Sequence, residues 1–191
     1  MVNLPNLITL ARLLSVPVAI WLVLSDELAA AFWLFVAAGL SDAVDGFIAK
    51  RLDQRSRLGA LLDPIADKVL LVSMYVTLGL SHALPAWLVI LVVFRDALII
   101  GGFLLITALS HPMRWEPLRV SKVNTALQIA LIGVVLAEHG LGLRLPGVAM
   151  WGLELTLDTV LIYAVGATTV ISGGGYLVRW WRTLAGVEAN P

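Results

Sequence analysis

The sequence contains no cysteine and has few charged residues. Without a thiol, the chain has no disulfide, no thiolate metal site, no thiol nucleophile and no lipidated cysteine. Charged residues make up 14% of the sequence, against roughly 25% in a typical soluble protein. The 13 Lys and Arg residues balance the 13 Asp and Glu residues, which excludes nucleic-acid binding by a strongly basic surface. The chemistry must therefore come from other side chains.

Apolar residues are abundant: they form 60% of the 191 residues, and the mean hydropathy is +0.93. A transmembrane helix needs about 20 mostly apolar residues. Such stretches lie at 7–24, 29–49, 60–80, 84–108, 121–138 and 150–178. We therefore expect an all-α integral membrane protein with six transmembrane helices, in which residues 1–191 form a single domain.

Basic residues are concentrated in the connections after the second and fourth apolar stretches and after the last one. The opposite connections contain Arg144 as their one basic residue. Because Lys and Arg favour the cytoplasmic side of a membrane, both termini are expected there. The residues that carry this asymmetry are Lys50, Arg51, Arg55, Arg57, Arg114, Arg119, Lys122, Arg179 and Arg182.

Two pairs of aspartates lie within the apolar stretches, Asp42 with Asp45 and Asp63 with Asp67. An Asp at the centre of a transmembrane helix costs about 2.5–3.5 kcal/mol, so these carboxylates need a compensating role. The spacings of three and four residues place each pair on one helical face. Mg²⁺ and Mn²⁺ prefer oxygen ligands and often complete their coordination with substrate phosphates. The sequence therefore predicts a metal site and a phosphate-bearing substrate.

Small residues accompany these aspartates, at Gly46, Ala49 and Gly59. They leave room for a bulky ligand beside the carboxylates. The alternative is that they permit close helix packing, as small residues do in many membrane proteins.

The segment DAVDGFIAK from Asp42 to Lys50 is followed, after eight residues, by GALLDPIAD from Gly59 to Asp67. This arrangement resembles the signature of the CDP-alcohol phosphatidyltransferases, D-x-x-D-G-x-x-A-R-x(8)-G-x(3)-D-x(3)-D. The one departure is Lys50 in place of the family's Arg, a role that the adjacent Arg51 is an alternative candidate to fill.

The resemblance implies a six-helix membrane enzyme, usually a homodimer, that uses two divalent ions, Mg²⁺ or Mn²⁺. In such enzymes the metals hold the pyrophosphate of a CDP-linked lipid, an acceptor hydroxyl attacks the lipid-bearing phosphorus, and CMP leaves. The implied metal ligands are Asp42, Asp45, Asp63 and Asp67, and Asp67 also acts as general base. The implied nucleotide and pyrophosphate site includes Gly46, Ala49, Lys50 and Gly59.

The N-terminal segment NLPNLITLAR, from Asn3 to Arg12, is similar to the start of phosphatidylglycerolphosphate synthases and of eukaryotic-type cardiolipin synthases. Both groups use CDP-diacylglycerol. We expect Asn6 and Thr9 either to contact the nucleotide or to cap the first helix. Arg12 is expected to face the polar cleft and to contribute to acceptor binding.

Two further segments bear on the acceptor. Arg95-Asp96 and the run Ser121-Lys122-Val123-Asn124-Thr125 look like the versions found in cardiolipin synthases. Glycerophosphate-using synthases tend to carry Arg-Glu and Gly-Lys instead. The expected reaction is therefore transfer of the phosphatidyl group of CDP-diacylglycerol to phosphatidylglycerol, giving cardiolipin and CMP. The alternative is a phosphatidylglycerolphosphate synthase that uses glycerol 3-phosphate.

The basic residues expected to hold the acceptor are Arg12, Arg95, Arg119 and Lys122. For Lys122 the alternative is an interfacial lysine that extends its ammonium toward the headgroups. The expected location is an integral membrane position, in a bacterial inner membrane, with the active site at the cytoplasmic face.

Two other classes of protein place aspartates inside a membrane. A membrane prenyltransferase also holds a Mg²⁺-diphosphate, but that architecture has more spans and a different carboxylate spacing. A cation channel or transporter needs polar residues through the full membrane thickness, whereas these aspartates cluster at one face. Release of CMP from CDP-diacylglycerol distinguishes the three classes.

Overall fold

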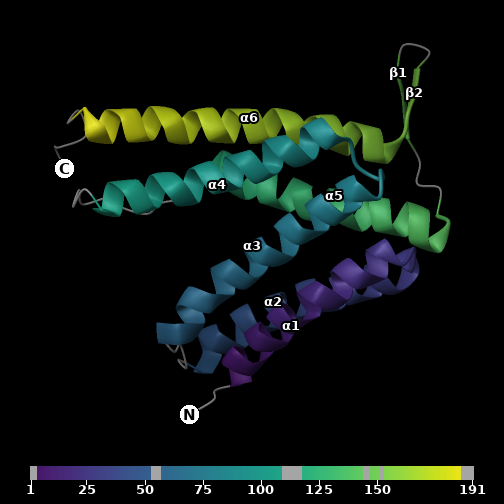
Figure 1. The fold of residues 1–191 in the computed structure, drawn as a ribbon, viewed down its shortest axis with the longest axis horizontal. Coiled ribbons are helices and arrows are strands. Elements are labelled where there is room, and N and C mark those ends of the chain that lie inside the picture. The colour runs from purple at the N-terminus through teal and green to yellow at the C-terminus, as the bar shows by residue number, and fades with distance from the viewer. Residues whose placement is uncertain (1–3, 53–56, 109–117, 144–146, 151–152, 186–191) are drawn as a thin grey trace. The chain divides into compact units, whose positions relative to one another are not determined.

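The computed structural model describes residues 4–52, 57–108, 118–143, 147–150 and 153–185. Within these ranges only the backbone is described for residues 4–8, 42–52, 57–67, 103–108, 148–150, 153–155 and 184. The helices are α1 (Leu4–Leu24), α2 (Leu28–Leu52), α3 (Arg57–Leu80), α4 (Ala86–Ala108), α5 (Arg119–Leu141) and α6 (Leu157–Leu184), as Figure 1 shows. One antiparallel hairpin, β1 (Val148–Met150) with β2 (Leu153–Leu155), precedes α6.

The first five helices coincide with the predicted apolar stretches, but the prediction for the last one was wrong at both ends. The stretch 150–178 was expected to be helical throughout, whereas Met150 belongs to β1 and α6 begins at Leu157 and continues to Leu184. Apolar and polar residues alternate over Leu153-Glu154-Leu155, which suits a strand. Thr156 takes the N-cap position with an extended backbone, and Asp158 lies in the first helical turn, where a carboxylate is favourable.

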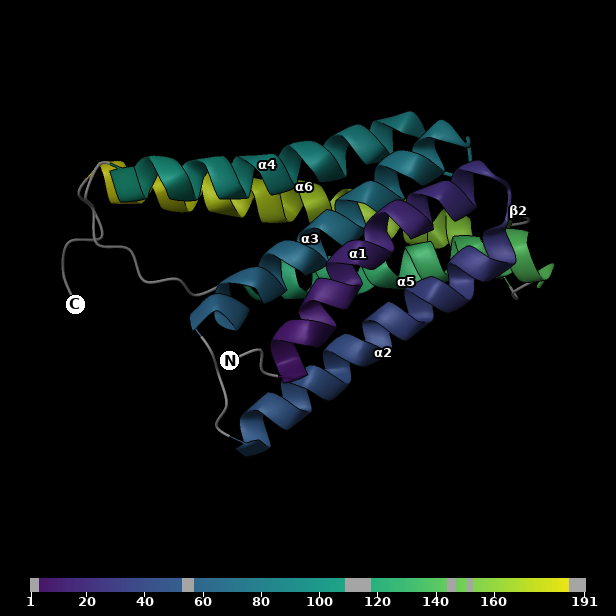
Figure 2. The ribbon, with the colours of Figure 1, turned by 60° about the horizontal axis from the view of Figure 1, so that its bottom comes forward.

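The chain forms two compact units. The first unit contains residues 1–84 and 132–147, and in it α1 packs against both α2 and α3 (Figure 2). One stripe of α1 is buried there, and its spacing of three and four residues is that of one helical face. The stripe consists of Thr9, Arg12, Val16, Ala19 and Val23.

The second unit contains residues 85–131 and 148–191. In it α4 and α6 pack side by side and run in the same direction. Trp87 stacks on Tyr163 near the start of both helices, with ring centroids 6.1 Å apart. Farther along, a Cβ at Gly102 would clash with the Trp180 ring, so a glycine is required where this ring approaches α4.

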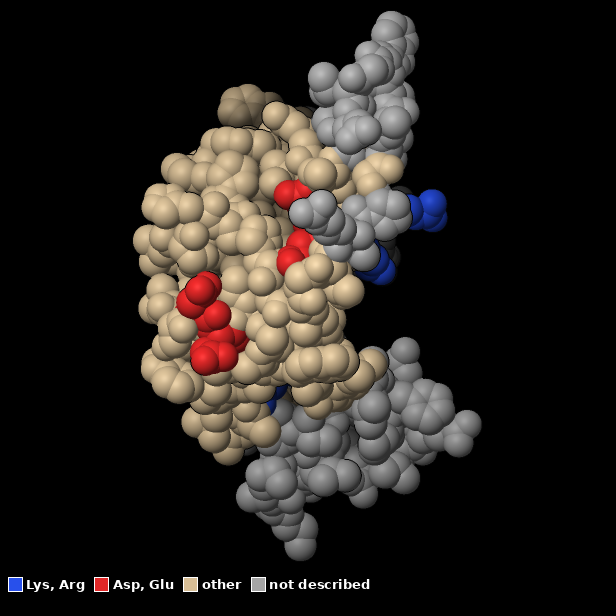
Figure 3. All heavy atoms as spheres, turned by 90° about the vertical axis from the view of Figure 1, so that its right-hand side faces the viewer, with Lys and Arg blue, Asp and Glu red and all other residues tan. Residues whose placement is uncertain are grey.

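Large apolar side chains are exposed on the helices of both units. Trp33 is 62% exposed, Phe94 66% and Trp181 75%. Lipid can cover exposed apolar side chains of this kind, whereas water solvates them poorly. Figure 3 looks onto the right-hand end of Figure 1, where a few acidic side chains lie among uncharged ones.

Within the described residues, two helical segments are long and apolar enough to cross a membrane, Arg119–Leu141 and Leu157–Thr183. Together with the exposed apolar surface, these helices indicate a membrane protein. The predicted number of six spans and the predicted cytoplasmic termini remain predictions.

Candidate active site

The aspartate motif lies on two helices of the first unit. Asp42 and Asp45 belong to α2, and Asp63 and Asp67 belong to α3, so the helical backbone that their spacing predicted is confirmed. Each pair therefore occupies one face of its helix. The side chains of the four aspartates and of Lys50 lie outside the described residues, as does everything beyond the backbone at Gly46, Ala49 and Gly59. Their roles as metal and nucleotide ligands stay predictions.

The N-terminal half of α1 lies at the same end of the first unit as the motif. A short turn at residues 25–27 reverses the chain between α1 and α2, so the end of α2 returns to the start of α1 (Figure 2). At this end Thr9 is 3% exposed and Arg12 is 4% exposed. A buried Arg in an apolar helix is expensive unless it faces a polar interior. The burial of Arg12 shows that it does not face lipid, and the polar cleft that it was expected to face remains a prediction.

The capping alternative for Asn6 and Thr9 was wrong. Helix α1 begins at Leu4, so both residues lie inside the helix and neither takes the N-cap position. Pro5 does not prevent this early start, because a backbone N–H in the first turn has no helical partner and its absence costs no hydrogen bond. The side chain of Asn6 lies outside the described residues, and its nucleotide contact remains a prediction.

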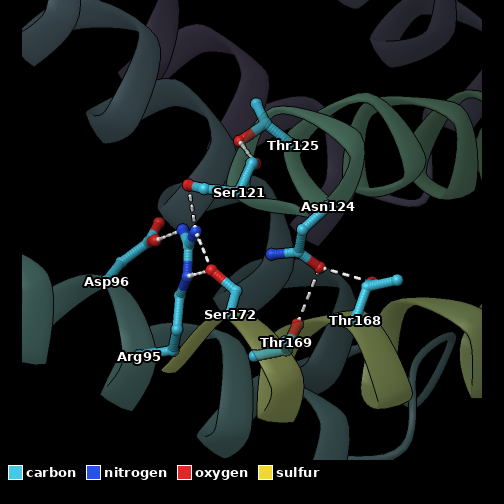
Figure 4. Close-up of polar contacts among 8 residues, drawn as sticks. All are labelled: Arg95, Asp96, Ser121, Asn124, Thr125, Thr168, Thr169 and Ser172. Atoms are coloured by element: carbon cyan, nitrogen blue, oxygen red, sulfur yellow. Dashed lines mark hydrogen bonds and ion pairs between the residues drawn. The ribbon is translucent and has the colours of Figure 1, made fainter. Parts of the chain in front are cut away.

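A buried polar cluster in the second unit centres on Arg95 of α4, as shown in Figure 4. Arg95 Nη1 donates to Asp96 Oδ1 at 2.6 Å, and both side chains are almost fully buried. Arg95 Nη2 donates to Ser172 Oγ of α6 at 2.7 Å, and Nε donates to the same oxygen at 3.3 Å. Nη2 also donates to Ser121 Oγ of α5. One guanidinium thus joins three helices.

A second polar bridge lies next to the first, again between α5 and α6 (Figure 4). Asn124 is completely buried, and its Oδ1 accepts hydrogen bonds from Thr168 Oγ1 at 2.8 Å and Thr169 Oγ1 at 2.9 Å. These two bonds set the orientation of the Asn124 amide: its oxygen faces α6, and its Nδ2 points away from the two threonines.

Sequence reasoning did not identify Thr168, Thr169 and Ser172 as contributors to this cluster. The signal was present, since the three polar residues interrupt an apolar stretch at spacings that place them on one helical face. Finding their partners required the packing of α4, α5 and α6, which the spacing within one helix does not specify.

The four basic residues predicted to hold an acceptor differ in exposure. Arg12 and Arg95 are buried, whereas Arg119 and Lys122, in the first turn of α5, are exposed. The N-terminus of a helix attracts anions through its free N–H groups and its dipole. Arg119 and Lys122 are therefore the members of this set that are open to a phosphate group.

Comparison with known proteins places the chain in a family. The family model described as CDP-alcohol phosphatidyltransferase matches residues 2–171. Among curated proteins, the chain is 35% identical to a Schizosaccharomyces pombe protein named as a cardiolipin synthase (CMP-forming) and mitochondrial hydrolase fusion, over 92% of this chain. It is 30% identical to a probable cardiolipin synthase (CMP-forming) of Drosophila melanogaster, over 95% of this chain.

A relative with a different name is similarly close. The chain is 33% identical, over 93% of its length, to a chloroplastic CDP-diacylglycerol–glycerol-3-phosphate 3-phosphatidyltransferase of Oryza sativa. The matched regions cover 31% of the yeast protein, 58% of the fly protein and 57% of the rice protein. Because the family model spans most of the chain, including the aspartate motif on α2 and α3, this protein belongs to the CDP-alcohol phosphatidyltransferase family.

Proposed function

We propose that this protein is a CDP-diacylglycerol-dependent cardiolipin synthase, which transfers a phosphatidyl group to phosphatidylglycerol and releases CMP. The observation that carries the proposal is the complete aspartate motif, set on two helices of a chain in this family. The relatives named as cardiolipin synthases support the choice of acceptor, as do Arg95-Asp96 and the Ser121–Thr125 segment.

The proposed reaction makes one bond and breaks another at the same phosphorus. The free glycerol hydroxyl of phosphatidylglycerol forms a new P–O bond to the lipid-bearing phosphorus of CDP-diacylglycerol. The bond from that phosphorus to the bridging oxygen breaks, and CMP leaves with the electron pair. Asp67 takes the hydroxyl proton as general base.

The donor set of the motif fits a pair of hard divalent cations. Asp42, Asp45, Asp63 and Asp67 supply only carboxylate oxygens, which Mg²⁺ and Mn²⁺ prefer. When bound, such ions neutralise the charge on the transferring and leaving oxygens. Gly46, Ala49 and Gly59 leave space for the nucleotide and pyrophosphate beside the carboxylates, and Lys50 or Arg51 adds positive charge there.

The acceptor phosphodiester is proposed to bind at the first turn of α5. Arg119 and Lys122 are exposed there, and the helix dipole favours an anion at this end. The role of Arg12, which is buried in the first unit, remains a separate prediction. We further propose that residues 1–191 act as one catalytic domain in a homodimer, with the active site at the cytoplasmic face of a bacterial inner membrane.

The second candidate is a phosphatidylglycerolphosphate synthase, which the rice relative favours by its name. The two acceptors differ physically. Glycerol 3-phosphate is a soluble dianion that needs a compact basic pocket, whereas phosphatidylglycerol presents a monoanionic phosphodiester from the bilayer. The exposed basic residues Arg119 and Lys122 suit either acceptor, so their charge alone does not decide between the two.

A direct competition between acceptors tests the proposal. Purified protein receives CDP-diacylglycerol, Mg²⁺ and equal concentrations of phosphatidylglycerol and glycerol 3-phosphate, and CMP and each lipid product are quantified. We expect cardiolipin as the main product. Conversion of glycerol 3-phosphate at a matching or higher rate would transfer the assignment to the second candidate.

A further inference from the structure

We infer that Arg95 is a positioning residue: through Ser121 and Ser172 it fixes the first turn of α5, and so determines where Arg119 and Lys122 meet the acceptor. This inference rests on the proposed function, because Arg95 can influence acceptor binding in this way only if the acceptor binds at the first turn of α5. It gives Ser172, and with it the middle of α6, a role in acceptor recognition.

The hydrogen bonds of Arg95 already occupy all three of its nitrogens. An arginine carries five N–H donors in a fixed fork. Here Nη1 donates to Asp96, Nε donates to Ser172, and Nη2 donates to both Ser172 and Ser121. The charge is balanced by Asp96, and Arg95 is only 3% exposed. An acceptor phosphate would have to displace these partners from a buried site, which carries a large desolvation cost.

The contacts between α5 and α6 form an ordered series along both helices. A Cβ at Gly175 would lie 3.0 Å from Leu118 Cδ1, so α6 approaches the residue just before α5 closely at this point. Ser121 and Ser172 then share the Arg95 guanidinium, and Asn124 bonds Thr168 and Thr169. Residue numbers rise along α5 as they fall along α6, so the two segments run antiparallel.

Arg119 and Lys122 lie on either side of Ser121 in the sequence, and both are exposed. A shift of Ser121 therefore moves both basic side chains. Because Arg95 is the cation that links Ser121 to α4 and α6, loss of its bonds should loosen this turn without removing any exposed charge. The expected effect is weaker binding of the acceptor at unchanged binding of the CDP-lipid.

The first test separates positioning from direct binding by kinetics. Ser172→Ala removes one partner of Arg95 and keeps its charge, and Thr183→Ala is the matched control, because Thr183 Oγ1 donates to the Arg179 carbonyl of the same helix. We expect Ser172→Ala to raise the KM for phosphatidylglycerol about three- to tenfold, with the KM for CDP-diacylglycerol unchanged. Thr183→Ala should resemble the parent protein.

The double variant Ser172→Ala/Lys122→Ala decides how the effect is transmitted. If Arg95 acts through α5, the serine substitution has a smaller effect once Lys122 is gone, because only Arg119 is left to be displaced. If the two effects multiply fully, Arg95 acts on the acceptor independently and the inference is wrong. Arg95→Lys keeps the charge and loses the fork, so we expect it to behave like Ser172→Ala or worse.

The second test does not depend on turnover. The chain has no cysteine, so spin labels can be attached at Val123→Cys and Leu177→Cys, which replace side chains 53% and 51% exposed in the second unit. We expect a narrow distance distribution in this background, broadened by Ser172→Ala and unaffected by Thr183→Ala. An unchanged distribution in Ser172→Ala would overturn the inference. Failure of the parent protein to use phosphatidylglycerol would instead overturn the proposed function.

Discussion

At the scale of single residues, the proposed reaction assigns different duties to the aspartates of α2 and α3. In this proposal Asp45 and Asp63 supply charge to the metals, whereas Asp67 also takes a proton. Replacement by asparagine keeps the shape and removes the charge, and an amide is a poorer ligand for a hard cation. We expect Asp45→Asn and Asp63→Asn each to reduce CMP release by at least about a hundredfold while the protein stays folded.

The control for this prediction is Asp26→Asn, which changes an exposed aspartate in the turn between α1 and α2. It should retain parent activity, and chelation of divalent ions should inactivate both the parent and this control. If Asp63→Asn at limiting Mg²⁺ releases CMP at nearly the rate of the parent protein, the metal assignment is wrong.

Lys122 allows a second prediction at this scale. Its exposed ammonium at the start of α5 is proposed to bind the acceptor phosphodiester. Lys122→Ala should raise the KM for phosphatidylglycerol about tenfold and leave binding of CDP-diacylglycerol intact, while Lys122→Arg keeps most of the affinity. Steady-state kinetics with each substrate varied in turn measure this. An equal rise in both KM values would place Lys122 at the nucleotide instead.

At the scale of elements, α5 approaches the start of α2 at Gly140. A Cβ there would lie 2.5 Å from the Leu28 carbonyl carbon and 2.6 Å from Ala29 N, and these backbone atoms cannot rotate away. Gly140→Ala should therefore destabilise the protein by about 1–3 kcal/mol, measured as a lower Tm in detergent. Gly133→Ala on the same helix is the control. A Cβ at Gly133 would meet no atom within 4 Å, and alanine has a higher helix propensity than glycine, so this variant should not lower the Tm. Equal Tm values for the two variants would contradict the close approach of α5 to α2.

The positions of the helices were predictable, because a long run of apolar residues is enough to locate a membrane-spanning helix. The hairpin β1–β2 was missed, since an average over about 20 residues hides a three-residue strand beside a long helix. The motif could be recognised because its spacing lies within two neighbouring helices. The partners of Arg95 could not, because Ser121 and Ser172 come together only when three helices pack.

At the scale of the whole molecule, the distribution of Lys and Arg predicts that the connection between α2 and α3 is cytoplasmic. Single cysteines at Gln54, in that connection, and at His82, an exposed residue between α3 and α4, test this in the cysteine-free chain. A membrane-impermeant thiol reagent added outside should label His82→Cys alone. Labelling of Gln54→Cys from outside would show that the predicted orientation is wrong and that the active site lies at the opposite membrane face.

The proposed reaction takes the phosphatidyl group from CDP-diacylglycerol and the accepting hydroxyl from phosphatidylglycerol. Purified protein with Mg²⁺ is given CDP-diacylglycerol and phosphatidylglycerol that carry acyl chains of different length, and the product is analysed by mass spectrometry. We expect cardiolipin with one pair of acyl chains from each substrate, and one CMP released for each cardiolipin formed. Cardiolipin with the acyl chains of phosphatidylglycerol alone, formed without CMP, would contradict it.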